Sequence, residues 1–467
     1  MTDERLAWLS ATEMSQGYAA RDFSPTEVHD AVQSVIARRE PTLNAFWQHD
    51  AVASKAAAGE SAQRWADGAA RGPLDGVPVT LKENIARRGV PMPAGNAGVT
   101  PVEPTQNAPI TDRLEEAGAI ILGSTVMPDW GMLSSGVSSR HGITRSPLNP
   151  AWTTGGSSSG AGAAAAGGYG PLHVGTDIGG SIRLPGTWLG LATLKPSDGR
   201  VPLDNPYLGR AAGPLTRTID DAAALMRVIS QPDPRDWASL PPLESDWQTT
   251  GFDPCRARVA VLADAGCGIP TDTQVRQAID NAADAFREAG ATVVRLDPWM
   301  TPELLADLDL FWRARSYVDF AALDESARSR VLPFIQRWVT SAKDTPGTRL
   351  MECYGSINRI RERTVAATQP FDVVLSPVAP MAAFPAEWPM PWGETDEGMA
   401  HIGFTAPYNM SGQPAATVNA GFTDDGRPIG LQLSGRRFDD VGALAAASWY
   451  EQHRPAGATV DWRSYDS

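Results

Sequence analysis

Residues 155–183 read GGSSSGAGAAAAGGYGPLHVGTDIGGSIR, and this stretch decides the fold. It holds two clusters rich in glycine and serine, at 155–162 and 175–183. Between them an alanine-rich run predicts a helix over 158–168, and an apolar run predicts a strand over 172–176. Backbone N–H groups at such junctions point outward and bind negative charge. The stretch therefore predicts an α/β protein with an anion-binding loop beside its sheet.

Outward from this stretch, the chain alternates between strand-like and helical segments. Residues 76–82 read GVPVTLK, and the alternation of Val77, Val79 and Leu81 with other residues predicts a strand. This strand ends at Lys82, on the face opposite the valines. Further strands are predicted at 119–123, 258–263, 291–296 and 372–376, and further helices at 51–70, 110–117 and 271–290. Alternation at these lengths predicts helices on both faces of the sheet.

One long segment breaks the alternation. Residues 302–367 have a helical pattern and no strand-like run, which predicts a helical insertion in the sheet domain. No linker separates the insertion from the rest, so we expect a single domain over residues 1–467.

The composition excludes several classes of partner. The 467 residues include 40 Lys and Arg against 54 Asp and Glu, and the net charge of -14 provides no basic surface for nucleic acid or an anionic membrane. No run of ~18 apolar residues could cross a bilayer, and the first residues lack the pattern of a signal peptide. The three cysteines and six histidines are scattered without metal-binding spacing. We expect a cytoplasmic monomer or homodimer that binds a small molecule and no metal.

The anion is not expected to be a phosphate, because neither cluster contains the GxxxxGK[ST] motif or a GxGxxG motif in its usual context. The oxyanion of a tetrahedral intermediate fits the clusters better. That chemistry needs a nucleophile and a base. No GxSxG motif accompanies a well-placed histidine, and His173 lies in a strand-like run, where a buried structural role is expected. Lys82 is the alternative base, since burial lowers the pKa of a lysine.

These residues resemble one known family. The matching motifs are GPLDGVPVTLKEN at 72–84, GGSS, GTDIGGSIRLP and LKP within 154–196, NMSGQPAA at 409–416 and GRPIGLQ at 426–432. Together with the spacing of Lys82, Ser157 and Ser181, they are similar to the amidase signature family of serine hydrolases. The likeness covers roughly residues 5–455. It implies a large mixed β-sheet covered by helices on both faces, and catalysis without a cofactor.

The resemblance also implies a role for each motif residue. Ser181 is expected to be the nucleophile, and Ser157, on a cis peptide bond, to relay a proton to Lys82. Ser158 is expected to form a hydrogen bond near Lys82. Asp177 and Arg183 are expected to orient the oxyanion loop that they flank. The backbone N–H groups expected to form the oxyanion hole are those of Ile178, Gly179, Gly180 and Ser181.

Two positions depart from the family pattern. Ser159 replaces a glycine in the first cluster, and Trp188 stands in a segment where small residues are usual, so it is expected to alter the packing behind the nucleophile. The substrate pocket of the family corresponds to Trp130, Gly131, Met132 and Leu133 together with part of residues 305–340. With Trp388 and Trp392 on a proline-rich loop, these residues predict an apolar, aromatic pocket. No cluster of Arg or Lys accompanies the motifs to indicate a carboxylate-bearing substrate.

The sequence therefore predicts an amidase that cleaves a linear carboxylic amide, with an aromatic or medium-sized apolar acyl group, through an acyl-enzyme on Ser181. The first alternative is the A subunit of a glutamine-dependent tRNA amidotransferase, which shares the signature. An alternative of another class is a catalytically silent binding protein on the same fold.

Overall fold

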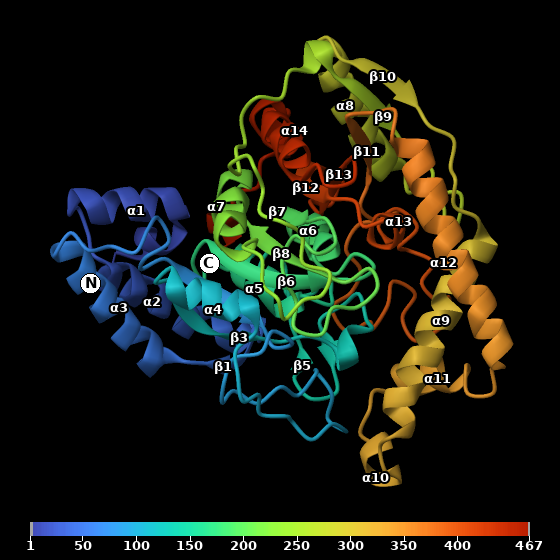
Figure 1. The fold of residues 1–467 in the computed structure, drawn as a ribbon, viewed down its shortest axis with the longest axis horizontal. Helices are drawn as coiled ribbons and strands as arrows, with labels where there is room; N and C mark the ends of the chain where they lie inside the picture. Colours follow the sequence, from blue (N-terminus) through green and yellow to red (C-terminus); the bar gives the residue numbers. More distant parts are fainter. Residues whose placement is uncertain (1–2, 466–467) are drawn as a thin grey trace.

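The computed structural model describes residues 3–465, and a single mixed sheet of 11 strands forms the centre of this part (Figure 1). A separate two-stranded ribbon consists of β4 (Val137–Ser138) and β5 (Gly142–Ile143). Across the large sheet the strands follow the order β1 (Phe46–His49), β3 (Ile120–Thr125), β2 (Pro78–Lys82), β6 (Leu172–Asp177), β8 (Ala211–Thr216), β7 (Ala192–Lys195), β12 (Ala415–Phe422), β13 (Pro428–Gly435), β11 (Val373–Pro377), β9 (Arg258–Val261) and β10 (Thr292–Arg295).

The direction of the strands changes across the sheet. β3, β2 and β6 are mutually parallel, as are β11, β9 and β10 near the other edge, whereas the strands between β6 and β11 are antiparallel to their neighbours. Because β2 and β6 are parallel, with Leu81 opposite Val174, their carboxyl ends lie side by side. Lys82, at the end of β2, is therefore next to the loop that follows Asp177.

Helices cover both faces of this sheet, as predicted. Leu215 of β8 packs with the residues of the short helices α5 and α6, while Val174 and Ala212 belong to the larger core on the other face with α7, α8 and α14. The α-helices are α1 (Ala11–Ala20), α2 (Pro25–Leu43), α3 (Ala51–Ala66), α4 (Pro109–Glu116), α5 (Ser159–Ala166), α6 (Arg183–Leu189), α7 (Ile219–Ile229), α8 (Thr273–Glu288), α9 (Pro302–Ala321), α10 (Glu325–Arg328), α11 (Pro333–Thr340), α12 (Gly347–Thr368), α13 (Ala406–Met410) and α14 (Asp440–His453). Short 3-10 helices are η1 (Glu4–Trp8), η2 (Asp129–Gly131), η3 (Pro254–Arg256), η4 (Ala456–Ala458) and η5 (Trp462–Tyr465).

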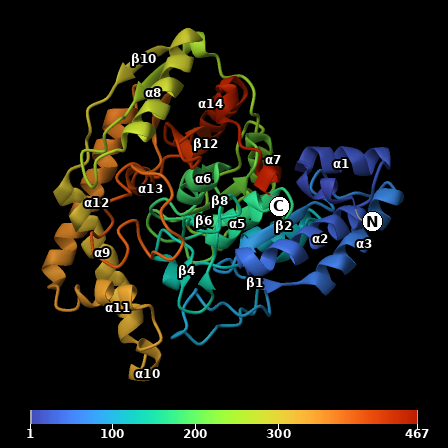
Figure 2. The same cartoon turned by 180° about the vertical axis from the view of Figure 1, so that it is seen from behind.

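Helices α9 to α12 fill residues 302–368, where the sequence predicts a helical insertion. They lie at the end of the molecule away from α1, α2 and α3, and α9 and α12 run side by side in both views (Figures 1 and 2). Their apolar side chains, Trp312 and Trp338 among them, form a second core with residues near α6 and α13. None of the helices within residues 3–465 is long and apolar enough to cross a membrane.

Candidate active site

Lys82 is fully buried at the carboxyl end of β2, on the sheet face that α5 covers. Val79 and Leu81 point into the larger core, so Thr80 and Lys82 point to the opposite face, as the alternation predicts. The Lys82 Nζ donates to Ser157 Oγ at 2.8 Å. It lies 3.2 Å from Ser158 Oγ and 3.2 Å from Thr176 Oγ1. Hydroxyl groups of the two clusters thus surround the amine.

Burial, and after it the positive charge of Arg210, lowers the pKa of Lys82 to about 7. The carboxylates of Asp177 and Glu83 act in the opposite direction. A lysine with this pKa is about half neutral at pH 7. It is therefore able to accept a proton under ordinary conditions.

Ser157 and Ser181 lie on two loops that meet beside Lys82. The Gly156–Ser157 peptide bond is cis. A Cβ at Gly156 would approach the carbonyl oxygen of Ser135 to 2.4 Å, so the close packing of this loop requires glycine. The backbone N–H of Ser158 donates to the carbonyl of Ser181 at 3.2 Å, which joins the two loops.

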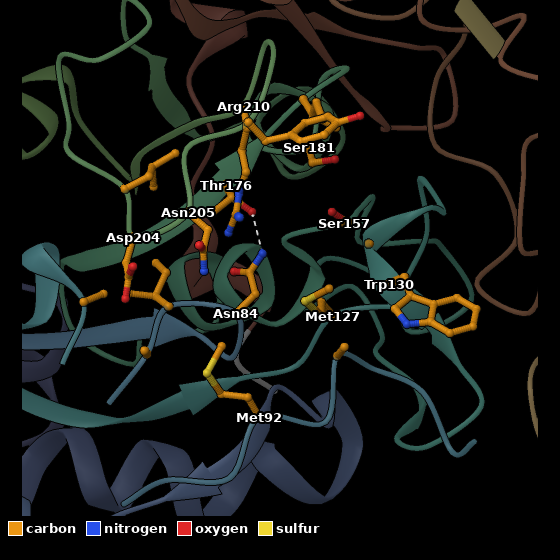
Figure 3. A pocket seen from close by; sticks show the side chains of 18 of the residues that line it. Asn84, Met92, Met127, Trp130, Ser157, Thr176, Ser181, Asp204, Asn205 and Arg210 are labelled. Carbon is orange, nitrogen blue, oxygen red and sulfur yellow. Dashed lines mark hydrogen bonds between the residues drawn. The ribbon is translucent and has the colours of Figure 1, made fainter. Parts of the chain in front are cut away.

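Both hydroxyl-bearing side chains line one cavity, and both are labelled in Figure 3. Ser181 is 8% exposed and Ser157 is 4% exposed, so protein encloses most of each residue. Between residues 3 and 465, no hydrogen bond joins the two hydroxyls directly.

The loop from Asp177 to Arg183 is arranged around a carboxylate. Asp177 Oδ1 accepts the N–H of Gly180 at 2.8 Å, and Asp177 Oδ2 accepts the N–H of Ile182 at 3.0 Å. The N–H of Gly180 is therefore occupied, which differs from the oxyanion-hole role expected for it. In the described part of the chain, the N–H groups of Ile178, Gly179 and Ser181 have no acceptor. The carboxylate thus fixes the loop while those three amides stay free.

Arg183 holds this carboxylate and connects it to the C-terminal strands. Its Nε and Nη2 donate to the two oxygens of Asp177 at 3.0 and 2.9 Å, and its Nη1 donates to Gln432 Oε1 at 2.8 Å. Asn409 Nδ2 donates to Asp177 Oδ1 at 2.8 Å. Burial opposes ionisation of Asp177, but the Arg183 guanidinium and these hydrogen bonds keep its pKa well below the usual range. Asp177 is thus a charged structural residue, not a proton carrier.

His173 has the structural position that the sequence predicts. It is buried in β6, Thr80 Oγ1 lies 2.9 Å from its Nδ1, and the Gly170 carbonyl lies 3.2 Å from its Nε2. Burial lowers its pKa to about 3, with a contribution from Arg217, so the ring is neutral.

The cavity has a volume of about 520 Å³. The predicted pocket residues Trp130, Gly131 and Met132 line it, together with Met92 and Met127 (Figure 3). Leu133 and Trp312 line a small apolar recess next to Gly179 and Ser181.

Trp388 and Trp392 do not line the cavity, and their expected role was wrong. Trp388 is 41% exposed, and Trp392 packs edge-on against the buried His401 ring. Their proline-rich loop instead pairs with Trp152, through a bridge at Pro385.

The cavity also contains polar residues that the sequence motifs did not indicate. Arg210, which precedes β8, and Arg315 of α9 both line it, contrary to the expectation that no basic residues accompany the site. Thr176 contacts Lys82 and accepts a hydrogen bond from Asn84 Nδ2 at 3.0 Å. Thr176 and Asn84 belong to the motifs quoted in the sequence analysis, so the sequence could have indicated that they lie at the site. Arg210 and Arg315 lie outside them.

The two departures from the family pattern are buried away from the cavity. Ser159 begins α5, and its Oγ donates to the carbonyl of Val126 at 3.4 Å. Trp188 lies in α6, its Nε1 donates to the carbonyl of Met381 at 3.1 Å, and its ring packs edge-on against Phe384. A Cβ at Gly155 would come within 2.8 Å of the Trp188 ring, so Trp188 packs closely against the loop that carries Ser157.

The family model for Amidase matches residues 27–444. The chain belongs to the amidase signature family. An acylamidase from Rhodococcus erythropolis is 33% identical to it over 470 residues, which cover 97% of both proteins. The A subunit of the glutamyl-tRNA(Gln) amidotransferase from Chloroflexus aurantiacus is 30% identical, over 95% of this chain and 96% of that protein.

Solved structures lead to the same family. A bacterial aryl acylamidase of the amidase signature family superposes with a TM-score of 0.87 and 26% identity, over 98% of both chains. The amidase signature resemblance and the predicted fold class are thus confirmed, and the chain is a hydrolase of this family. No group of three or more His, Cys, Asp or Glu side chains in residues 3–465 is placed to hold a metal ion.

Proposed function

We propose that this amidase signature hydrolase cleaves a linear carboxylic amide to an acid and an amine or ammonia, with Ser181 as nucleophile. One observation carries the proposal: the buried Lys82 amine, with a pKa of about 7, donates to Ser157 Oγ at 2.8 Å beside a cavity that Ser181 also lines. This is the arrangement that a serine nucleophile needs when no histidine is present.

Acylation uses the two serines and the lysine in sequence. The Ser181 Oγ attacks the amide carbon, its proton passes to Ser157 Oγ, and the Ser157 proton passes to neutral Lys82. The electron pair of the carbonyl moves to oxygen and forms the oxyanion. Collapse of this intermediate breaks the C–N bond, and the leaving nitrogen takes the proton back through Ser157. The product of this stage is an ester on Ser181.

Deacylation repeats the relay with water. Water attacks the ester carbon and its proton reaches Lys82 through Ser157. The second tetrahedral intermediate then collapses, the acid leaves, and Ser181 Oγ regains its proton. No other group has to change its protonation state.

The free N–H groups of Ile178, Gly179 and Ser181 are the donors we propose for the oxyanion. Gly180 is left out because its N–H already donates to Asp177. Loss of one such donor typically costs ~10²- to 10³-fold in kcat. Asp177 and Arg183 position the loop, and Ser158, through its contact with Lys82, positions the amine.

The part of the substrate near Ser181 is proposed to be aromatic or a medium-sized apolar group. Supporting this, Met127, Trp130 and Met132 line the cavity. A volume of about 520 Å³ accommodates a small molecule rather than a folded protein segment.

Mass spectrometry of the intact protein tests the nucleophile. Incubation with an aryl or alkyl amide is expected to add the mass of the acyl group to the wild-type chain and not to Ser181→Ala. Ser159→Ala is the matched control, because Ser159 lies in the same glycine–serine region with its hydroxyl buried against Val126. Acylation of Ser181→Ala at the wild-type rate would refute the assignment.

The A subunit of a glutamine-dependent tRNA amidotransferase is the second candidate, and the 30% identity to one such protein supports it. A protein of that kind would hydrolyse glutamine and require partner subunits, whereas an independent amidase turns over simple amides alone. A purified chain that cleaves aryl amides but not glutamine favours the first proposal. A chain that binds amides and cleaves none would favour a silent binding protein.

A further inference from the structure

Arg210 is a cation without a partner inside the cavity. In the view of Figure 3 its guanidinium extends toward Asn84 and Thr176, which also line the cavity. Within residues 3–465 the side chain of Arg210 forms no hydrogen bond or ion pair. The charge that acts on it most is repulsive, from Arg315, and desolvation together with this repulsion lowers its pKa.

Three other arginines enclosed by the chain have acceptors, and one of them, Arg217, donates to backbone carbonyls such as that of Gly170. Arg183 bonds Asp177, and Arg200 bonds Asp440. Enclosing a guanidinium without a partner is costly, because the group loses hydration without gaining an acceptor. With 54 acidic residues against 40 basic ones, the chain has carboxylates in excess, yet none pairs with Arg210 in the described residues. The acceptor that is missing from the protein is one that a bound molecule can supply.

Arg315 adds a second cation from a different element. It belongs to α9, and its guanidinium lies 4.6 Å from the centre of the Tyr207 ring. This stacking restrains the guanidinium while leaving its N–H groups available. Arg315 has no ion pair in the described residues. Helix α9 and the segment before β8 thus bring two unpaired guanidinium groups to one cavity.

We propose that Arg210 and Arg315 form a subsite for a carboxylate group of the substrate. The inference rests on the proposed amide hydrolysis and specifies its substrate class: an amide with an apolar part near Ser181 and an anionic end. Trp130 and Arg210 lie on opposite sides of Ser157 in Figure 3, which fits a substrate with two unlike ends. Arginine is suited to this task because its planar fork binds both carboxylate oxygens.

Three acids also line the cavity and have to be weighed, of which Asp177 is already paired with Arg183. The other two are Asp204 and Asp319. Asp319 is exposed, Asp204 is half-buried, and neither forms an ion pair with Arg210 or Arg315. Solvent screens the charge of the exposed Asp319 more strongly than the charges of Arg210 and Arg315, which are both partly buried. Neither Asp204 nor Asp319 therefore neutralises the two guanidinium groups by direct contact.

Matched amides provide the test. The first set is 4-carbamoylbutanoate, pentanamide and 4-aminobutanamide, which differ only in a carboxylate, methyl or ammonium end on the acyl half. The second set is 4-acetamidobenzoate and 4-methylacetanilide, which place the carboxylate on the amine half. We expect kcat/KM to favour the carboxylate member in one of the sets. The set that shows this preference identifies which half of the substrate carries the charge.

Arg210→Gln removes the charge and keeps a polar side chain. The ratio of kcat/KM for the carboxylate and methyl members is expected to fall by ~10- to 100-fold, since hydrogen bonds to charged groups are of this strength. The ratio cancels any general effect on catalysis. Arg315→Gln is expected to lower the ratio as well. Arg88→Gln is the charge-matched control, because Arg88 is exposed and does not line the cavity.

Two outcomes overturn the inference. The first is that Arg210→Gln has the same ratio of kcat/KM for the carboxylate and methyl members as the wild type. The second is a preference for the ammonium member, which would mean that Asp204 and Asp319 bind the polar end of the substrate. Binding to Ser181→Ala separates this inference from the proposed function. If calorimetry shows that the variant binds 4-carbamoylbutanoate, and that adding Arg210→Gln weakens binding by ~10-fold or more, the subsite stands even when the wild type cleaves no amide.

Discussion

The pH dependence of hydrolysis tests the central element of the mechanism, the neutral Lys82. With a pKa of about 7, roughly one tenth of Lys82 is neutral at pH 6 and about nine tenths at pH 8. Because the neutral form accepts the proton, kcat/KM is expected to rise about 10-fold between these two values and then level off. Initial rates on one uncharged amide, in buffers of constant ionic strength, measure the profile.

Two substitutions move the midpoint of this profile in opposite directions. The charge of Arg210 lowers the pKa of Lys82 and the charge of Glu83 raises it. Arg210→Gln is therefore expected to shift the midpoint to higher pH, and Glu83→Gln to lower pH. A flat profile from pH 5 to 9, or shifts of the same sign in both variants, would refute the assignment of Lys82 as the base.

Three further substitutions test the structure, two of them at the site and one in the distant helix α3. Gly155→Ala places a Cβ on a residue with a φ of 78°, at 2.8 Å from the Trp188 ring. Urea unfolding is expected to show that the free energy of unfolding falls by ~2–4 kcal/mol. Unchanged stability would contradict the clash. Gly59→Ala, in α3 with open space around it, is expected to gain ~0.5–1 kcal/mol in the same assay, and a loss would show that the helix is strained there. Asp177→Asn leaves Arg183 buried without its ion-pair partner, so a loss of ~3–5 kcal/mol is expected together with a loss of turnover; a fully stable, fully active variant would remove Asp177 from the positioning role.

Local sequence predicted the elements that hold the site because their patterns are complete within short segments. The alternation around Val79 and Leu81 was sufficient to place Lys82 at a strand end and on the correct face. The alanine-rich run predicted α5, and the apolar run predicted β6 as far as the motif that follows it. Strand β1 was missed, since Phe46–His49 is only four residues long and every one of them is partly exposed.

The walls of the cavity could not be predicted in the same way. Arg210 and Arg315 meet there from two distant segments, and nothing near Arg210 in sequence indicates that it lacks a carboxylate partner. The prediction that Trp388 and Trp392 line the pocket was wrong for the converse reason. Aromatic residues on a proline-rich loop indicate that the loop covers something, but only the tertiary packing determines which surface.

The bond from Asn409 to Asp177 and the bond from Arg183 to Gln432 have a consequence for the order of events during synthesis. Arg183 and Gln432 are 249 residues apart. At ~5–20 residues per second, the ribosome needs roughly 10–50 s to make the interval between them. During that time Asp177 and Arg183 have each other but not the two amide side chains that complete the network. The nascent chain therefore carries Ser181, the proposed nucleophile, long before it carries the groups that complete the network around the loop. A chain released before residue 432 would have Ser181 without that network.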